Sequence, residues 1–280
     1  MNNKVISGLG FNDEVRFYIV DSKQLVQTVC DKNKSYPIAS TVLGRCISIT
    51  GLMGLMLKGD SEITTIIEAD GPLGKVITIA NPKGETRSLV ANPQLDLKLI
   101  NNKLDISGAV GTIGNIKVIK DLKMRDPFVS ETSIISGDIN MDFTYYFSYS
   151  EQTGTAITSG VTFNEDFTIN TAGALIVQLL PNASEDTIDK LESVMKSLKP
   201  IEVLLVENSL EDILKIVFND DYRQLKEATL EYKCICNEDR FIDGIRLLSL
   251  DEIIDIKKDK FVECTCNFCH TVYNIDTNKI

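Results

Sequence analysis

The chain has 280 residues, of which 43% are hydrophobic and 25% charged, so wholesale disorder is excluded and one large and one small domain are expected. Its formal net charge of -11 argues against nucleic-acid binding, because that binding depends on Lys and Arg neutralising phosphates. The stretch Met1–Phe11 lacks a basic region followed by an apolar run and a cleavage site. We therefore expect no secretory signal and a cytoplasmic protein.

Up to about Asn170, short apolar or alternating runs lie between turn-forming residues, a pattern typical of strands. The runs that predict strands are Val15–Val20, Ile63–Glu68, Val76–Ile79 and Phe143–Tyr149. The apolar segment Ser40–Leu57 predicts a helix packed on the resulting sheet, with Ser40 or Thr41 as its cap. It contains Arg45 and falls short of the ~20 apolar residues of a membrane span, so we expect it in the core. Residues 1–181 are thus predicted to form a large α+β domain of mixed sheet and helix.

The pattern changes near Pro181, after which apolar residues recur at helical spacing. Ser184 is placed to cap a helix that Pro200 ends, and Ser209 with Asp212 resembles a capping arrangement before a second helix. Two helices are therefore expected between the large domain and the tail, which predicts a helical linker over residues 182–231.

The tail, residues 232–280, has its own signals. Ser249 and Glu252 form a capping box ahead of an apolar run, and the segments around Phe261 and Val272 predict two short strands joined by a tight turn. One helix and a hairpin bury little apolar surface, so a unit of this size usually needs a metal ion or a disulfide.

Five of the seven cysteines lie in this tail. Cys234-Ile235-Cys236 and Cys266-Asn267-Phe268-Cys269 are two close pairs separated by residues 237–265. Zinc prefers soft sulfur ligands, and each short spacing lets two sulfur atoms reach one ion. The pattern therefore predicts a tetrahedral zinc site made by these four thiolates, with one Zn²⁺ per chain.

Spacing alone leaves two uses of the zinc site open. A static structural site is the commoner one, whereas the Cys-x-Cys pair favours a redox switch, because zinc-bound thiolates remain nucleophilic and can be oxidised. Cys264 is a possible accessory thiol, since Cys264-Thr265-Cys266 is a further Cys-x-Cys. Cys30 and Cys46 are expected to be small buried hydrophobic residues.

Two other classes of protein compete with a switch. An enzyme is disfavoured, because a single histidine, His270, makes Ser-His-Asp or Cys-His catalysis implausible and no full phosphate-binding loop is present. A thiol-disulfide oxidoreductase that uses Cys266 and Cys269 needs a strand-turn-helix context that the flanking residues lack. A binding module with a purely structural zinc ribbon remains the second alternative.

The tail resembles that of the redox-regulated heat-shock chaperonins of bacteria, the thirty-three-kilodalton holdase family, which carry Cys-x-Cys, a long gap and Cys-x-x-Cys. The likeness extends through the chain in the family's order. The matching stretches are Leu43-Gly44-Arg45, Ala69–Gly74, Val90-Ala91-Asn92-Pro93, Gly108-Ala109-Val110-Gly111, Asp142–Gln152 and Gly173–Pro181.

The resemblance implies a dimeric, ATP-independent holdase that binds unfolding client proteins and is not an enzyme. It implies that the reduced protein is dormant with zinc on the four thiolates, and that oxidation forms the disulfides Cys234–Cys236 and Cys266–Cys269, releases zinc and loosens the linker. Residues 1–181 would then bind clients and form the homodimer, with neither nucleic acid nor membrane as a partner.

The chain differs from the family pattern near both cysteine pairs. Asn237-Glu238-Asp239-Arg240 stands where the family usually has a serine and more basic residues, and His270 stands where glycine or asparagine is common. We expect His270 to face solvent in a turn, because four sulfur atoms already fill a zinc site.

Overall fold

The computed structural model describes residues 3–96, 99–100 and 103–280. The chain divides into two compact units, Met1–Tyr232 and Lys233–Ile280, called here the large unit and the small unit. Both contain helices and sheet, so the predicted α+β class is confirmed. The segment 182–231, expected to be a linker, lies within the large unit.

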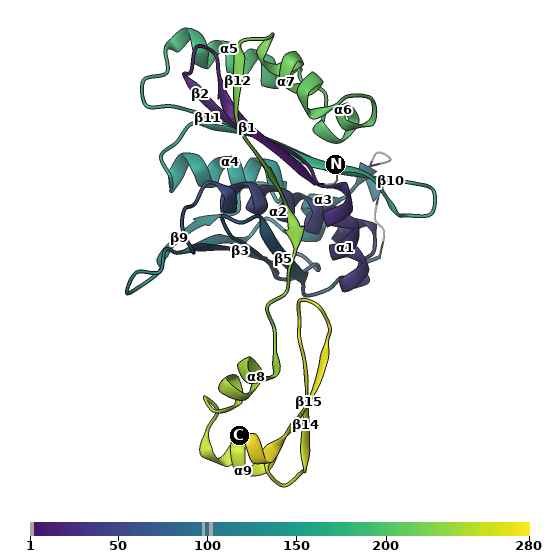
Figure 1. Ribbon diagram of the computed structural model, residues 1–280. Coiled ribbons are helices and arrows are strands. Elements are labelled where there is room, and N and C mark those ends of the chain that lie inside the picture. The colour runs from purple at the N-terminus through teal and green to yellow at the C-terminus, as the bar shows by residue number, and fades with distance from the viewer. Residues whose placement is uncertain (1–2, 97–98, 101–102) are drawn as a thin grey trace. The chain divides into compact units, whose positions relative to one another are not determined.

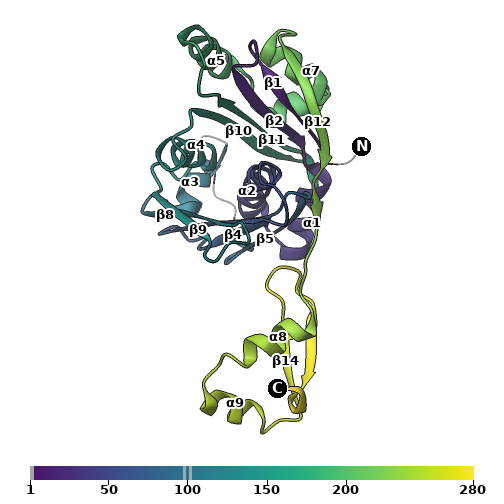
Figure 2. The same cartoon turned by 60° about the vertical axis from the view of Figure 1, so that its left-hand side comes forward.

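The large unit is built in four layers, which Figure 1 and Figure 2 show from two sides. Its two sheets lie on either side of a layer of helices, and three more helices cover the outer face of the first sheet. The first sheet is antiparallel, with the order β10 (Thr155–Phe163), β11 (Ile169–Leu179), β2 (Val15–Asp21), β1 (Lys4–Gly10), β12 (Tyr222–Thr229).

The second sheet has six strands, of which only the short strand β13 pairs in parallel. Its order is β13 (Glu231–Tyr232), β5 (Glu85–Val90), β4 (Val76–Ala80), β3 (Glu62–Ala69), β8 (Gly114–Asp121), β9 (Phe128–Ser133). The strands predicted at 15–20, 63–68 and 76–79 are thus confirmed within a residue or two at each end. A separate hairpin joins β6 (Leu99–Ile100) to β7 (Lys103–Leu104), and helix α3 (Ile106–Val110) follows it.

Helices α1 (Lys23–Asn33), α2 (Pro37–Leu55) and α4 (Ile139–Tyr149) lie between the two sheets and share their main apolar core. Helix α2 is long and apolar enough to cross a membrane, but 89% of its most apolar window is buried inside the protein. The expectation of a core helix is therefore confirmed.

The predicted cap of α2, Ser40 or Thr41, was wrong by four or five residues. Tyr36 is the N-cap, and Pro37 occupies the first turn, where its fixed φ suits a helix and its missing N–H costs no hydrogen bond. The hydroxyls of Ser40 and Thr41 donate instead to the backbone O atoms of Ser35 and Pro37.

The strand predicted at Phe143–Tyr149 is wrong, because this segment belongs to helix α4. Its aromatic residues favour a strand locally. The Asp138 side chain, however, accepts hydrogen bonds from the N–H groups of Asn140 and Met141 and so caps a helix. Ile139, Asp142, Phe143, Tyr146 and Phe147 then fall on one buried face at helical spacing.

Three helices cover the outer face of the first sheet and form a second apolar core with it. They are α5 (Glu185–Ser197), α6 (Ile201–Glu207) and α7 (Leu210–Phe218). The predicted cap Ser184 and the capping box of Ser209 and Asp212 are confirmed. Both predicted helices are thus present, and the segment 182–231 also contains helix α6 and strand β12, which pairs with β1; neither of these was predicted.

The small unit contains helices α8 (Glu238–Ile245) and α9 (Leu250–Ile256), the hairpin β14 (Phe261–Thr265) and β15 (Val272–Asp276), and a short 3-10 turn (Thr277–Lys279). The predicted hairpin and the capping box of Ser249 and Glu252 are confirmed. Helix α8 was not predicted, although Asn237 caps it by accepting a hydrogen bond from the N–H of Arg240.

Candidate metal centre

Two segments of the small unit carry the four cysteines. Cys234 and Cys236 lie in the irregular segment between β13 and α8. The Asn237 cap begins the helix immediately afterwards and so ends the segment just beyond the second cysteine.

Cys266 and Cys269 lie in the turn that joins β14 to β15. The N–H of Cys266 donates to the O of Thr271 at 3.0 Å, and the N–H of His270 donates to the O of Cys266 at 2.8 Å. His270 adopts a left-handed φ of 57°, and this tight turn brings both cysteine side chains to the same side.

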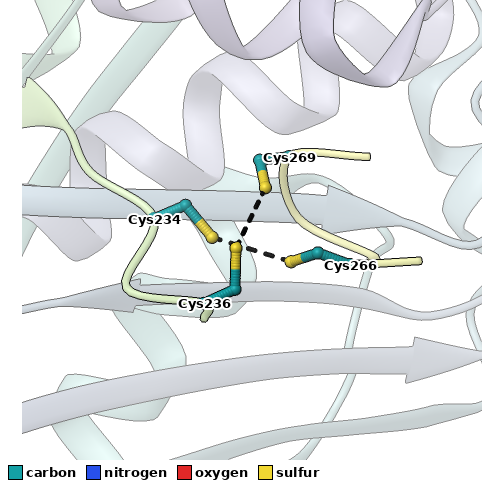
Figure 3. A group of neighbouring side chains, drawn as sticks. All are labelled: Cys234, Cys236, Cys266 and Cys269. Carbon is teal, nitrogen blue, oxygen red and sulfur yellow. Dashed lines mark hydrogen bonds between the residues drawn. The ribbon is translucent and has the colours of Figure 1, made fainter. Parts of the chain in front are cut away.

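The four Sγ atoms form a compact group in which each lies within 4.8 Å of every other (Figure 3). The contacts drawn in Figure 3 join the two segments: Cys234 Sγ is 3.6 Å from Cys266 Sγ, and Cys236 Sγ is 3.3 Å from Cys269 Sγ. All four cysteines are free thiols. Cys266 is buried and the other three are partly buried.

This donor set fits zinc. Sulfur atoms that surround Zn²⁺ tetrahedrally at about 2.3 Å lie about 3.8 Å from one another, close to the separations seen here. Four soft sulfur ligands with no oxygen donor among them favour zinc over magnesium or calcium. The cluster therefore has the composition and the size of a four-cysteine metal centre.

The thiols of this cluster differ in acidity. Burial raises the pKa of Cys234 to about 12, well above its ordinary value. Burial also disfavours the Cys269 thiolate, but hydrogen bonds from the Thr271 hydroxyl and backbone N–H and from the neighbouring thiols outweigh it and lower the pKa of Cys269 to about 6. In the absence of a metal, Cys269 is thus the thiolate of the group at neutral pH.

Sequence reasoning missed Tyr273. Its hydroxyl lies 3.3 Å from Cys236 Sγ and donates to the backbone O of Cys236 at 3.2 Å, so it fixes the first cysteine segment against the hairpin. Contact with Cys236 raises the pKa of Tyr273 to about 12, which keeps the hydroxyl a donor. The only signal in the sequence is an aromatic residue on a strand next to a cysteine turn, which is too common to identify such a role.

The remaining candidates lie outside the cluster. Cys264 pairs with Tyr273 across the hairpin and packs against the small apolar core, where burial raises its pKa. His270 is exposed, as expected. Cys30 and Cys46 are buried in the large unit, also as expected.

Comparison with known proteins gives a consistent result. A family model described as Hsp33 protein matches residues 3–276. The 33 kDa chaperonin of Oceanobacillus iheyensis is 40% identical over 284 residues, which cover 100% of this chain and 98% of that protein. The 33 kDa chaperonin of Staphylococcus aureus is 37% identical over 273 residues, which cover 96% of this chain and 93% of that protein.

A solved structure agrees with these relatives. The crystal structure of the 33 kDa chaperonin of Thermotoga maritima, a heat shock protein 33 homolog, superposes with a TM-score of 0.92 at 30% identity and covers 99% of this chain and 96% of that one. With a family model spanning nearly the whole sequence and relatives similar over their full length, this chain belongs to the Hsp33 family of 33 kDa chaperonins.

Proposed function

We propose that this Hsp33 chaperone is a redox-switched, ATP-independent holdase. In the reduced state Cys234, Cys236, Cys266 and Cys269 hold one Zn²⁺ and the protein is dormant. Oxidation forms disulfides within the two cysteine pairs, ends zinc binding and exposes apolar surface to unfolding client proteins.

One observation carries this proposal: four mutually close thiols lie in a unit with almost no core of its own. The buried apolar residues of the small unit are Ile242, Ile245 and Ile275. Bound zinc would supply ligand bonds that structural sites convert into folding free energy, on the order of 10 to 16 kcal/mol in small peptides. Loss of the ligands would therefore unfold the small unit.

Each disulfide forms with the loss of two electrons from two zinc-bound thiolates, and one molecule of peroxide accepts these electrons together with two protons from solvent to give two molecules of water. Cys234, Cys236 and Cys269 are only partly buried, so an oxidant reaches these three more readily than the buried Cys266. A cysteine that has entered a disulfide no longer offers the negative charge that the metal requires.

We assign the disulfides to Cys234–Cys236 and Cys266–Cys269. In the folded small unit, sulfur contacts of 3.6 and 3.3 Å join Cys234 to Cys266 and Cys236 to Cys269. Disulfides across these contacts would staple the two segments together and keep the unit folded, which would oppose a switch. Once the unit opens, closing a loop of a few residues costs less entropy than closing one of about thirty, and pairing within each motif is favoured.

Unfolding of the small unit would then change the large unit. We propose that the helices of 182–231 loosen as a linker when the small unit unfolds, since α6 and α7 already expose Val203, Val206 and Ile216. The loosened segment would uncover the second apolar core of the large unit. Residues 1–181 would bind clients and form a homodimer in the cytoplasm, without nucleic-acid or membrane partners.

The test measures zinc and holdase activity together. Zinc-reconstituted protein is treated with peroxide at elevated temperature, and zinc content and suppression of client aggregation are followed before and after. Release of about one zinc ion per chain, with activity appearing only after oxidation, is expected. Peptide mass mapping of the oxidised protein should find disulfides within the two motifs.

Matched variants sharpen this test. Cys266→Ser should abolish zinc binding, because Cys266 is the buried member of the cluster, whereas Cys264→Ser should bind zinc as the wild type does. Zinc retained after peroxide, with no gain in activity, would leave a structural zinc site and reject the switch.

A further inference from the structure

A cavity of about 1280 Å³ lies in the large unit beside β10, the edge strand of the first sheet. Residues of α2, α4, α6, the end of α5, the strands β6 and β7 and helix α3 complete its walls. Much of the lining is apolar: Ile157, Val161, Phe163, Met195, Leu198 and Val203. Its volume exceeds the ~300 to 1,000 Å³ typical of pockets for small molecules, which favours a larger guest.

Five charged side chains line this cavity, namely Arg45, Lys103, Asp105, Asp138 and Glu202, and two of them, Arg45 and Glu202, each carry a buried polar atom without a partner. Arg45 of α2 donates from Nη1 to Asp138 Oδ2 at 3.0 Å. Within the described residues, the buried Nε of Arg45 has no acceptor and the buried Oε2 of Glu202 has no donor. A buried polar group without a partner destabilises the protein, so both atoms favour a guest that completes their hydrogen bonds.

The structure holds the Glu202 carboxylate in place. It lies directly against the Cα of Gly160 on β10, where an added methyl group would collide with it. The backbone O of Glu202 accepts a hydrogen bond from Thr171 Oγ1 at 2.7 Å, which ties α6 to β11. Burial raises the pKa of Glu202, and of the two charges nearby Arg45 lowers it and Asp138 raises it. A cation brought close to this carboxylate would relieve the cost of its burial.

We propose that this cavity binds an extended apolar polypeptide segment that carries a Lys or Arg side chain. The cation pairs with Glu202, a backbone carbonyl of the segment accepts from Arg45 Nε, and apolar side chains cover the lining residues. The net charge of -11 also favours the approach of basic segments. This inference rests on the chaperone function, since it identifies the guest as part of an unfolding client.

The cavity is formed entirely within the folded large unit, so its occupation does not require the small unit to unfold. The zinc-loaded, reduced protein therefore binds a short basic-apolar peptide even while it does not hold aggregating clients. This separates a permanent peptide site from the larger surface that oxidation would expose.

The test uses the full-length, zinc-loaded, reduced protein and two fluorescent peptides of about ten residues, each spanning at most ~35 Å when extended. Both are apolar, and they differ only in a central Lys or Glu. Fluorescence anisotropy should show tighter binding of the Lys peptide. Hydrogen exchange should slow at β10 and α6 when this peptide binds.

A matched pair of variants tests whether the Glu202 carboxylate binds the Lys side chain of the peptide. Glu202→Gln keeps the size of the side chain and should weaken binding of the Lys peptide about tenfold, with little effect on the Glu peptide. Glu207→Gln makes the same change at the exposed end of α6, outside the cavity, and should have no effect. Gly160→Ala should also weaken binding, because it displaces the Glu202 carboxylate.

Equal responses of the Glu202→Gln and Glu207→Gln variants would overturn the proposal, as would peptide protection confined to other strands. Protection of β10 and α6 that rises with protein concentration in the absence of peptide would also overturn it, because a second copy of the chain would then be the occupant. The aggregation assay on the oxidised wild type is read separately. Failure there rejects the switch, whereas failure of the peptide experiment alone rejects only this site.

Discussion

The two units of this protein are stabilised in different ways. The large unit buries two extensive apolar cores between its sheets and helices, whereas the small unit buries three isoleucines. Helix α9 has no buried residue, and Leu247 and Leu250 are 88% and 79% exposed. Packing therefore suffices for the large unit, and we expect the small unit to need zinc ligation by its four cysteines as well.

Removal of the metal should produce the largest difference in stability between the two units. A chelator should abolish the protection of backbone amides in β14, β15 and α8, because zinc ligation, as proposed, would supply most of the folding free energy of the small unit. The large unit should keep its protection, as followed by hydrogen exchange with mass spectrometry. Added zinc should restore the small unit. A hairpin that stays protected in chelator would show that the three isoleucines suffice.

Truncation of a core side chain should instead destabilise the large unit and leave the small unit unchanged. Phe143→Ala removes a fully buried ring from the main core and should lower the free energy of unfolding of the large unit by about 3 to 5 kcal/mol in a urea titration. Met141→Ala, on the same helix but at a 56% exposed position, should change it by less than about 0.5 kcal/mol. Zinc affinity should be unchanged in both variants, and a loss of zinc in Phe143→Ala would contradict the independence of the units.

The chain offers the same capping box in both units, at Ser209 with Asp212 and at Ser249 with Glu252. Loss of the cap in Ser209→Ala should lower the unfolding free energy of the large unit by about 1 kcal/mol. Ser249→Ala should instead reduce zinc affinity, by about fivefold, because folding and metal binding are coupled in the small unit. Equal zinc affinities for wild type and Ser249→Ala would show that α9 folds independently of the metal.

The smallest effect concerns the attachment of α5 to the first sheet. Hydrogen bonds from Thr187 and Ser184 lower the pKa of Glu14 from 4.5 to about 2, and Ser184 N and Oγ lie 2.8 and 2.7 Å from Glu14 Oε2. A depressed pKa contributes stability above the ordinary value, and this contribution is lost as the pH falls from 4.5 through about 2. The stability difference between wild type and Glu14→Gln should therefore shrink over this range, and a constant difference would exclude the linkage.

Local signals in the sequence were sufficient for several features of both units. Ser184, Ser209 and Ser249 cap helices as predicted, because a cap depends on hydrogen bonds within a few residues. The cysteine motifs likewise identified the four thiols that the fold gathers, since each short spacing already brings two sulfur atoms together. The whole-chain resemblance supplied the family, which the comparisons confirm.

Other features depended on contacts between distant residues, which no local pattern contains. Aromatic residues of Phe143–Tyr149 favour a strand, yet the segment is a helix because one face of it completes the core between two sheets. Strand β12 lies more than 200 residues from its partner β1, so its place in the first sheet could not be read from nearby sequence. The contact of Tyr273 with Cys236 and the meeting of Arg45 with Glu202 beside β10 likewise exist only after folding. The sequence by itself determined three helix caps, the hairpin of the small unit and which four sulfur atoms gather, whereas only the tertiary structure decided which charged and aromatic groups lie together, because their neighbours come from remote parts of the chain.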